Sequence, residues 1–250
     1  LIASDPVLCL AGHIQNYGWF KTKRVTGPVY DETDFENINL WLLTHNHEDH
    51  IDQFGLKVIA GDATVVAHTS LKKILSRTRL RDIRFLSTPE TTSYMSGETT
   101  ISITAIPAIH ARTKLLGTFI GNGNGYVLKI EKNMKNYVVY VTGDSLFNES
   151  VLEYLPGSPL DLVIANAGAA HIDRFALSRL VGRITNNNDD IRKMAEVLKP
   201  RMLIPVHWET FTHYYESVTD DSFSCFDMVK IPDRGKMMRL LACEASTDSR

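Results

Sequence analysis

The feature that most constrains this chain is a cluster of metal-capable side chains directly after an apolar run. Residues 40–44 are typical of a buried β-strand, and the pattern His45-x-His47-x-Asp49-His50 follows them. On a loop at a strand end, His45 and His47 point to one side, while Asp49 and His50 enter a helix and point to an adjacent position. One turn of chain can therefore serve two neighbouring metal ions. The alternative, a solvated polar loop, does not explain four potential ligands in so short a stretch.

Three further metal-capable side chains stand where other predicted strands end. His110, Asp144 and His207 are each the first such side chain after an apolar, β-rich run. Taken singly, a residue of this kind is more often a satisfied residue at the rim of a sheet than a ligand. Their shared location at strand ends, together with the cluster, favours one common metal centre.

Apolar, β-rich runs predict seven strands. They cover residues 40–44, 64–67, 100–106, 125–131, 137–142, 160–165 and 202–206. Strands dominate the first two thirds of the chain, and a strand, a helix and a strand follow. There is no internal repeat, low-complexity tract or linker in the sequence. The pattern predicts a single α/β domain over residues 1–250, built of layered, mixed sheets.

Helical patterns are fewer than strand patterns. The clearest covers residues 190–198, with Asn188 or Asp189 as its N-cap, and others are expected at residues 70–76 and directly after the cluster. The Gly- and Asn-rich run at residues 121–125 lies between two predicted strands, so we interpret it as a hairpin turn. A phosphate-binding loop is the alternative, but no helix follows the run as such a loop requires.

The composition narrows the class of protein and its partners. With 44% hydrophobic and 22% charged residues among 250, the chain is long enough for one large domain or two small ones. The net charge of −2 and the absence of a basic stripe argue against a nucleic-acid partner. The three cysteines lie far apart, which argues against a disulfide framework and fits a reducing cytoplasm. No apolar run approaches the ~20 residues of a transmembrane helix. We predict a cytoplasmic protein.

The order of these motifs along nearly the whole chain resembles the metallo-β-lactamase superfamily. It runs from the cluster through His110 and Thr142-Gly143-Asp144 to His207. The resemblance implies a four-layer αβ/βα sandwich of two mixed β-sheets flanked by helices, with metals at one edge between the sheets. It also assigns the ligands: His45, His47 and His110 to the first metal, Asp49, His50 and His207 to the second, and Asp144 to both.

Further stretches narrow the resemblance to a subgroup. Residues 204–211, together with residues 125–130, are similar to the group that contains ascorbate-6-phosphate lactonases and N-acyl phosphatidylethanolamine phospholipase D. Secreted β-lactamases often place Cys at the second metal, whereas this chain has Asp144, so we expect no antibiotic hydrolysis. Residues 185–190 lack the His that group members often carry, and that substrate contact is not carried over. The start Ser4-Asp5-Pro6 looks like the second strand of the fold, so we expect the first N-terminal hairpin to be missing.

The ligand types point to a reaction as well as a metal. Imidazoles and carboxylates favour Zn²⁺, with Mn²⁺ or Fe²⁺ as alternatives, and seven candidate ligands suggest two divalent ions. Two such ions lower the pKa of a bridging water, so we expect a metal-bound hydroxide to cleave a lactone, ester or phosphodiester. Asp49 is the candidate general acid/base. The alternative is a metal-binding sensor or scaffold of the same fold without turnover, but the complete ligand set favours a hydrolase.

Side chains near these ligands are candidates for substrate contact, and each has an alternative structural role. They are the aromatic patch of Tyr17, Trp19 and Phe20, the cations Arg112 and Lys114, and the lone histidines His171 and His213. Aromatic patches also pack loops against a core, loop cations are also simply solvated, and a lone histidine often satisfies a local hydrogen bond. We name Tyr17, Trp19, Arg112 and His213 as substrate-binding candidates. The expected partner is a small molecule, and a homo-oligomer stays open.

Overall fold

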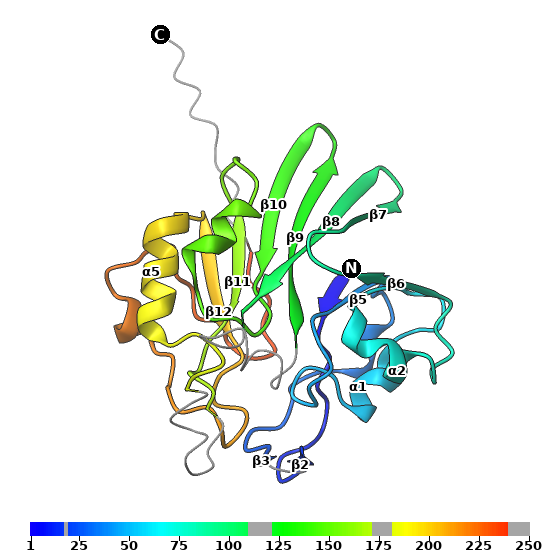
Figure 1. Ribbon diagram of the computed structural model, residues 1–250, viewed down its shortest axis with the longest axis horizontal. Helices are drawn as coiled ribbons and strands as arrows, with labels where there is room; N and C mark the ends of the chain where they lie inside the picture. Colours follow the sequence, from blue (N-terminus) through cyan, green and yellow to red (C-terminus); the bar gives the residue numbers. More distant parts are fainter. Residues whose placement is uncertain (18–19, 110–121, 172–181, 240–250) are drawn as a thin grey trace.

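Two β-sheets face each other in the computed structural model, which describes residues 1–17, 20–109, 122–171 and 182–239 (Figure 1). The first sheet is parallel throughout and has the order β1 (Ile2–Ser4), β4 (Leu40–Leu43), β5 (Thr64–His68), β6 (Asp82–Leu86). The second has the order β12 (Met202–Val206), β11 (Leu162–Asn166), β10 (Lys135–Val141), β9 (Gly123–Lys132), β8 (Thr99–Ala108), β7 (Thr91–Ser96). It is mixed, because β10, β11 and β12 run parallel and the other neighbours antiparallel. A separate hairpin pairs β2 (Ile14–Asn16) with β3 (Lys21–Lys23).

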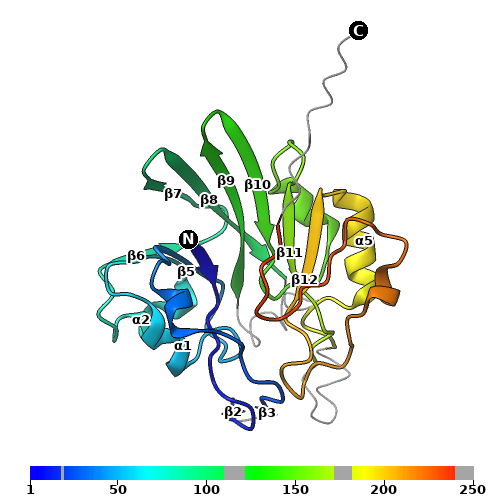
Figure 2. The ribbon, with the colours of Figure 1, turned by 180° about the vertical axis from the view of Figure 1, so that it is seen from behind.

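Helices cover the outer face of each sheet (Figure 2). Helices α1 (Gln53–Val58) and α2 (Lys72–Leu75) lie on the first sheet, and α5 (Asn188–Leu198) lies on the second. Short 3-10 turns complete the described elements: η1 (Glu32–Phe35), η2 (Thr69–Leu71), η3 (Glu149–Glu153) and η4 (Asp220–Phe223). The order helix, sheet, sheet, helix is the predicted four-layer sandwich. Among the described residues, no helix has the length and apolar character needed to cross a membrane.

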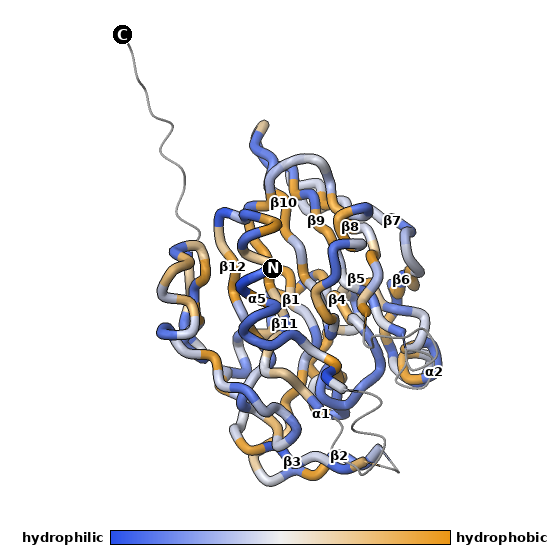
Figure 3. Tube along the Cα trace, turned by 60° about the vertical axis from the view of Figure 1, so that its left-hand side comes forward, coloured by the Kyte–Doolittle hydropathy of each residue, from blue (hydrophilic) through white to orange (hydrophobic). Residues whose placement is uncertain are grey.

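Strand β4 shows why the layers form. Its side chains alternate between the two faces of the sheet. Leu40 and Leu42 pack with Tyr126 between the sheets, whereas Trp41 and Leu43 pack on the helix side. All four residues of β4 are at most 1% exposed. A strand buried on both faces is apolar throughout, which is typical of a parallel sheet covered by helices. In Figure 3 hydrophobic stretches, in orange, run along several of the central strands.

The seven predicted strands are present, with bounds that differ by at most two residues. The predicted turn at residues 121–125 is wrong for its described C-terminal part, because Gly123, Asn124 and Gly125 pair with the last residues of β8. Close packing explains these residue types. A Cβ on Gly125 would lie 2.9 Å from the Thr142 carbonyl oxygen, and the Asn124 amide donates to the Leu86 carbonyl at 2.9 Å.

The helices differ from the predictions mainly at their ends. Helix α5 begins at Asn188 because Asn187, rather than Asn188 or Asp189, is its N-cap. Asn187 Oδ1 accepts from the Asp190 amide at 2.9 Å, and Asp190 Oδ2 accepts from the Asn187 amide at 3.2 Å, which is a capping box. The helix predicted at residues 70–76 is divided between η2 and α2.

Candidate metal centre

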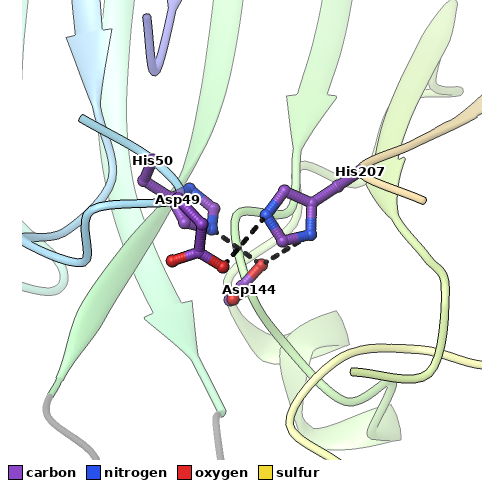
Figure 4. Close-up of side chains that lie close together, drawn as sticks. All are labelled: Asp49, His50, Asp144 and His207. Atoms are coloured by element: carbon purple, nitrogen blue, oxygen red, sulfur yellow. Dashed lines mark ion pairs between the residues drawn. The ribbon is translucent and has the colours of Figure 1, made fainter. Parts of the chain in front are cut away.

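The predicted ligands meet where strands of both sheets end. The loop after β4 carries the cluster, Asp144 follows β10, and His207 follows β12. Figure 4 shows the side chains of Asp49, His50, Asp144 and His207 converging on one point. One ligand atom from each of these four lies within 4.8 Å of the others, and His45, His47 and Asp144 form a second group of the same kind. Asp144 is therefore shared by both groups.

Two glycines allow the chain to approach this centre closely. Gly143 has φ +60°, and a Cβ there would lie 2.8 Å from the Asn124 carbonyl oxygen, so the turn before Asp144 requires glycine. Gly168 has φ +85°, and its Cβ would lie 2.9 Å from the His207 carbonyl oxygen. His207 itself has φ +64°, which is uncommon for a residue with a side chain. The backbone at His207 is thus strained at a candidate ligand.

Asp5, which follows β1, orients His50. Its Oδ2 lies 2.8 Å from His50 Nδ1, and its two oxygens also accept from the amide and hydroxyl of Thr44, at 2.8 and 2.6 Å. Because a carboxylate only accepts, His50 Nδ1 carries a hydrogen, and Nε2 is the nitrogen that can bind a metal ion in place of a proton. His50 Nε2 lies 3.0 Å from Asp144 Oδ1. Burial lowers the pKa of His50, but the carboxylates of Asp144 and Asp5 outweigh it and hold that pKa well above its usual value.

Tyr214 orients His207 in a similar way. Its hydroxyl donates to Asp49 Oδ2 at 3.3 Å and lies 2.8 Å from His207 Nε2. The Tyr214 hydroxyl thus occupies Nε2, and Nδ1 is the ring nitrogen directed at the site. His207 Nδ1 lies 3.5 Å from Asp144 Oδ1. Burial lowers the pKa of His207, which favours the neutral ring that metals bind.

Two buried ring nitrogens test whether the residues fit a metal. Among the described residues, His50 Nε2 and His207 Nδ1 are buried and make no hydrogen bond. A buried polar atom without a hydrogen-bond partner lowers the stability of the folded state by about 1–3 kcal/mol. Such atoms therefore indicate a bound ligand. The donors available are imidazole nitrogens and carboxylate oxygens, which suit Zn²⁺, Mn²⁺ or Fe²⁺. The residues present fit divalent metal ions.

The other group contains two predicted ligands of the first metal. His45 is 1% exposed, and its Nδ1 lies 3.0 Å from the Thr44 hydroxyl. That hydroxyl donates to Asp5, so it accepts from His45 Nδ1. His45 Nε2 then faces His47 Nδ1 at 2.9 Å. The third predicted ligand, His110, lies outside the described residues.

Asp49 is held at both carboxylate oxygens. The Tyr17 hydroxyl donates to Oδ1 at 3.0 Å, and His213 Nε2 lies 3.2 Å from Oδ2. Burial raises the pKa of Asp49, but the hydrogen bond from His213 and the imidazoles of His50 and His207 outweigh it. The pKa of Asp49 is held well below its usual value, so the carboxylate is ionised.

Asn166, at the end of β11, holds the shared carboxylate. Its side-chain amide donates to Asp144 Oδ1 at 2.8 Å, and the side-chain amide of Asn186 donates to the Asn166 carbonyl at 2.8 Å. Neither Asp5 nor Asn166 was predicted to be functional. The available signal was only their position, since each is a polar residue at the end of an apolar run.

The predicted substrate residues differ in where they lie relative to the candidate metal centre. Tyr17 is half-buried beside Asp49, and His213 is 4% exposed. Phe20 packs against both, with ring centroids 5.9 Å from Tyr17 and 5.7 Å from His213. The ring of His171 packs against Tyr215 at 5.3 Å, and His171 belongs to neither ligand group among the described residues. Trp19, Arg112 and Lys114 lie outside the described residues.

Comparisons with known proteins show the family and the fold. Residues 5–208 match the family described as the β-lactamase superfamily domain. A metal-dependent hydrolase of Pyrococcus horikoshii is 28% identical over 183 residues, which are 71% of this chain and 70% of the relative. An isothiocyanate hydrolase from Delia radicum gut bacteria has a similar structure, with a TM-score of 0.73 and 20% identity over 94% of this chain and 90% of that one. A possible metal-dependent hydrolase of Veillonella parvula gives a TM-score of 0.74 and 20% identity over 93% and 90%. The chain belongs to the metallo-β-lactamase superfamily.

Proposed function

We propose that this protein is a hydrolase with two divalent metal ions, Zn²⁺ in the first place, and that it cleaves a small lactone, ester or phosphodiester. The observation that carries the proposal is the orientation of His50 and His207, because a buried ring nitrogen of each faces Asp144. Asp49, His50 and His207 would hold one ion, His45 and His47 the other, and Asp144 both. When bound, such ions activate water and polarise the group under attack.

Asp49 is proposed as the general acid/base. An ionised carboxylate can accept a proton from the attacking water and return it to the leaving group. The Tyr17 and Tyr214 hydroxyls keep it in place, because each donates to one of its oxygens. Burial and the charge of Asp49 raise the pKa of both tyrosines far above the usual value, so these hydroxyls stay protonated and remain donors.

Metal stoichiometry tests the site independently of any substrate. Purified protein should be saturated with Zn²⁺, separated from free metal and subjected to elemental analysis. We expect two ions per chain, since the two groups of ligands share only Asp144. A His207→Ala variant should lose one of the two ions. One tightly bound ion in the parent protein at saturation would contradict a binuclear centre.

A panel of model substrates tests the reaction. It should contain bis-(p-nitrophenyl) phosphate, a p-nitrophenyl ester, a lactone, nitrocefin and, because of the structural neighbour, an isothiocyanate. We expect a lactone, ester or phosphodiester to be cleaved far faster than nitrocefin, with activity lost on chelation and restored by Zn²⁺. A nitrocefin rate equal to the best of these would overturn the predicted subgroup. Full metal loading without turnover of any member would favour the alternative, a sensor or scaffold.

A further inference from the structure

A chain of hydrogen bonds runs from strand β3 to Asp49 through His213. The backbone amide of Lys23 donates to Thr212 Oγ1 at 3.1 Å, and Thr212 Oγ1 lies 3.2 Å from Thr22 Oγ1. Thr22 Oγ1 lies 2.7 Å from His213 Nδ1, and His213 Nε2 lies 3.2 Å from Asp49 Oδ2. The chain thus connects the β2–β3 hairpin, which belongs to neither sheet, to a candidate metal ligand.

For a neutral His213 ring, one placement of hydrogens satisfies every member of this chain. The ionised Asp49 only accepts, so His213 Nε2 carries the hydrogen and Nδ1 accepts. Thr22 must then donate its hydroxyl hydrogen to His213 Nδ1, and its oxygen accepts from Thr212. The Thr212 oxygen in turn accepts from the Lys23 amide. Thr22 therefore selects the tautomer of His213.

Aromatic neighbours fix the plane of the His213 ring. Its centroid lies 4.4 Å from that of Tyr214, 5.7 Å from Phe20 and 5.8 Å from Phe211. The residue is 4% exposed, and both of its ring nitrogens contact protein groups. Little of this ring is left for a substrate to contact. Nε2 of the ring is instead directed at Asp49.

Thr22 itself is placed by the pattern of β3. It is 2% exposed, whereas Lys21 and Lys23 on either side are exposed. A buried hydroxyl needs a hydrogen-bond partner, and the partners available to Thr22 are Thr212 and His213. The hairpin therefore delivers one hydroxyl into the interior, beside the ring that contacts Asp49.

We propose that His213 is a positioning residue for Asp49 rather than a substrate-binding one, and that Thr22 sets its Nε2–H tautomer. With Tyr17 on Oδ1 and His213 on Oδ2, the Asp49 carboxylate is held at both oxygens beside His50 and His207. Partners of this kind, one step removed from a metal, commonly change its affinity about 10–100-fold. The inference rests on the proposed metal site but does not depend on hydrolysis.

The test compares Thr22→Val, which keeps the shape and loses the hydroxyl, with Thr22→Ser, which keeps the hydroxyl. Thr26→Val is the matched control. Thr26 lies next to the same hairpin, and its hydroxyl donates to the Glu209 carbonyl and not to His213. The ¹⁵N shifts of the His213 ring are recorded by NMR in zinc-free and zinc-loaded protein. The affinity of the weaker zinc site is measured by competition with a chromophoric chelator.

We expect the Nε2–H tautomer in the parent, Thr22→Ser and Thr26→Val proteins. Thr22→Val should give a mixture of tautomers and bind the weaker zinc about tenfold less tightly. An Nδ1–H tautomer or a doubly protonated ring in the zinc-loaded parent would overturn the proposal, as would identical shifts and zinc affinities in Thr22→Val and Thr22→Ser. Both readouts stand without any substrate, so absence of hydrolysis alone contradicts the proposed function and not this inference.

Discussion

The two carboxylate oxygens of Asp49 accept from different donors, and this makes Asp49→Asn an informative change. The amide keeps one oxygen but turns the other into a donor, which then opposes either the Tyr17 hydroxyl or His213 Nε2. We expect kcat to fall about 10²–10⁴-fold even with both metal sites full, because an amide cannot accept the proton. Substrates with better leaving groups should lose less, because they need less protonation on departure.

The measurement is metal content and kcat for Asp49→Asn, over esters of graded leaving-group pKa. Glu48→Gln is the matched control. Glu48 is exposed and precedes Asp49 in the chain, and its substitution removes the same single negative charge. Recovery of full activity at saturating metal, with the same leaving-group dependence as the parent, would reduce Asp49 to a metal ligand.

At the scale of single elements, helix α1 depends on one carboxylate. Asp52 is 6% exposed; its Oδ1 caps α1 by accepting from Phe54 and Gly55 amides, and its Oδ2 accepts from Leu8 and Cys9 amides. Four backbone donors thus converge on one side chain directly after the candidate metal-binding cluster. The cap also joins the N-terminal segment to the loop that carries His50.

We expect Asp52→Ala to lower the free energy of unfolding by about 2–4 kcal/mol, since it removes a cap and leaves buried amides unsatisfied. Urea denaturation measures the change. Asp31→Ala is the control, because Asp31 is exposed and caps η1, a turn that contains no buried residue. An equal loss in the two variants would mean that the Leu8 and Cys9 contacts add nothing to the cap.

Gly168, in the turn after β11, lies against the backbone of the candidate ligand His207. In Gly168→Ala the new Cβ would meet the His207 carbonyl oxygen at 2.9 Å, so the backbone of His207 must shift. Gly12→Ala is matched to it, because Gly12 also has positive φ but no atom within 4 Å of the added Cβ. Both variants should be destabilised by the backbone conformation, but only Gly168→Ala should lose zinc affinity, about tenfold or more. Equal zinc affinities, measured by chelator competition, would contradict this role of Gly168.

At the scale of the whole molecule, apolar strands made most of the fold predictable. Strands such as β4 and β11 lie inside a layered structure, so their residues are apolar over several positions in a row. Strand β7 and the hairpin strand β3 were not predicted, because they are short or largely polar and carry no continuous apolar run. Each pairs with its neighbour in sequence, β7 with β8 and β3 with β2, so their burial pattern rather than a distant partner hid them.

The candidate site was predictable to the extent that its ligands are close in sequence. The cluster from His45 to His50 carries its own signal in four side chains. Asp5, Thr22 and Asn166 carry no signal beyond their position, because a single polar residue after or within a strand looks the same whether it faces solvent or a ligand. Their roles follow only from distances such as the 2.8 Å between Asn166 and Asp144.

Metal binding joins both sheets, so it should stabilise the whole fold. Zinc at 100 times its Kd should add about 2.7 kcal/mol to the free energy of unfolding, or roughly 5–10 °C in Tm. In metal-free protein the raised pKa of His50 contributes stability that is present at low pH and lost as pH rises through that pKa. Zinc needs the deprotonated ring, so the proton competes with it. The zinc-induced rise in Tm should therefore shrink as pH falls from about 8 to about 6.

Calorimetry with zinc and with chelator, at several pH values, measures this difference. In Asp5→Asn the zinc-induced rise in Tm should depend less on pH, because that variant removes one of the carboxylates that raise the pKa of His50. The same zinc-induced rise at pH 6 and pH 8 would contradict competition between zinc and the proton.

Because the ligands come from the ends of β4, β10 and β12, they are made at very different times during translation. A ribosome that has finished residue 50 has produced a histidine-rich loop, but Asp144 and His207 are still to come. Any ion captured at that stage is held by fewer donors than in the folded protein, and it exchanges readily with the surrounding metal pool. On the proposed ligand assignment, the complete set of donors exists only after β12 has joined the second sheet.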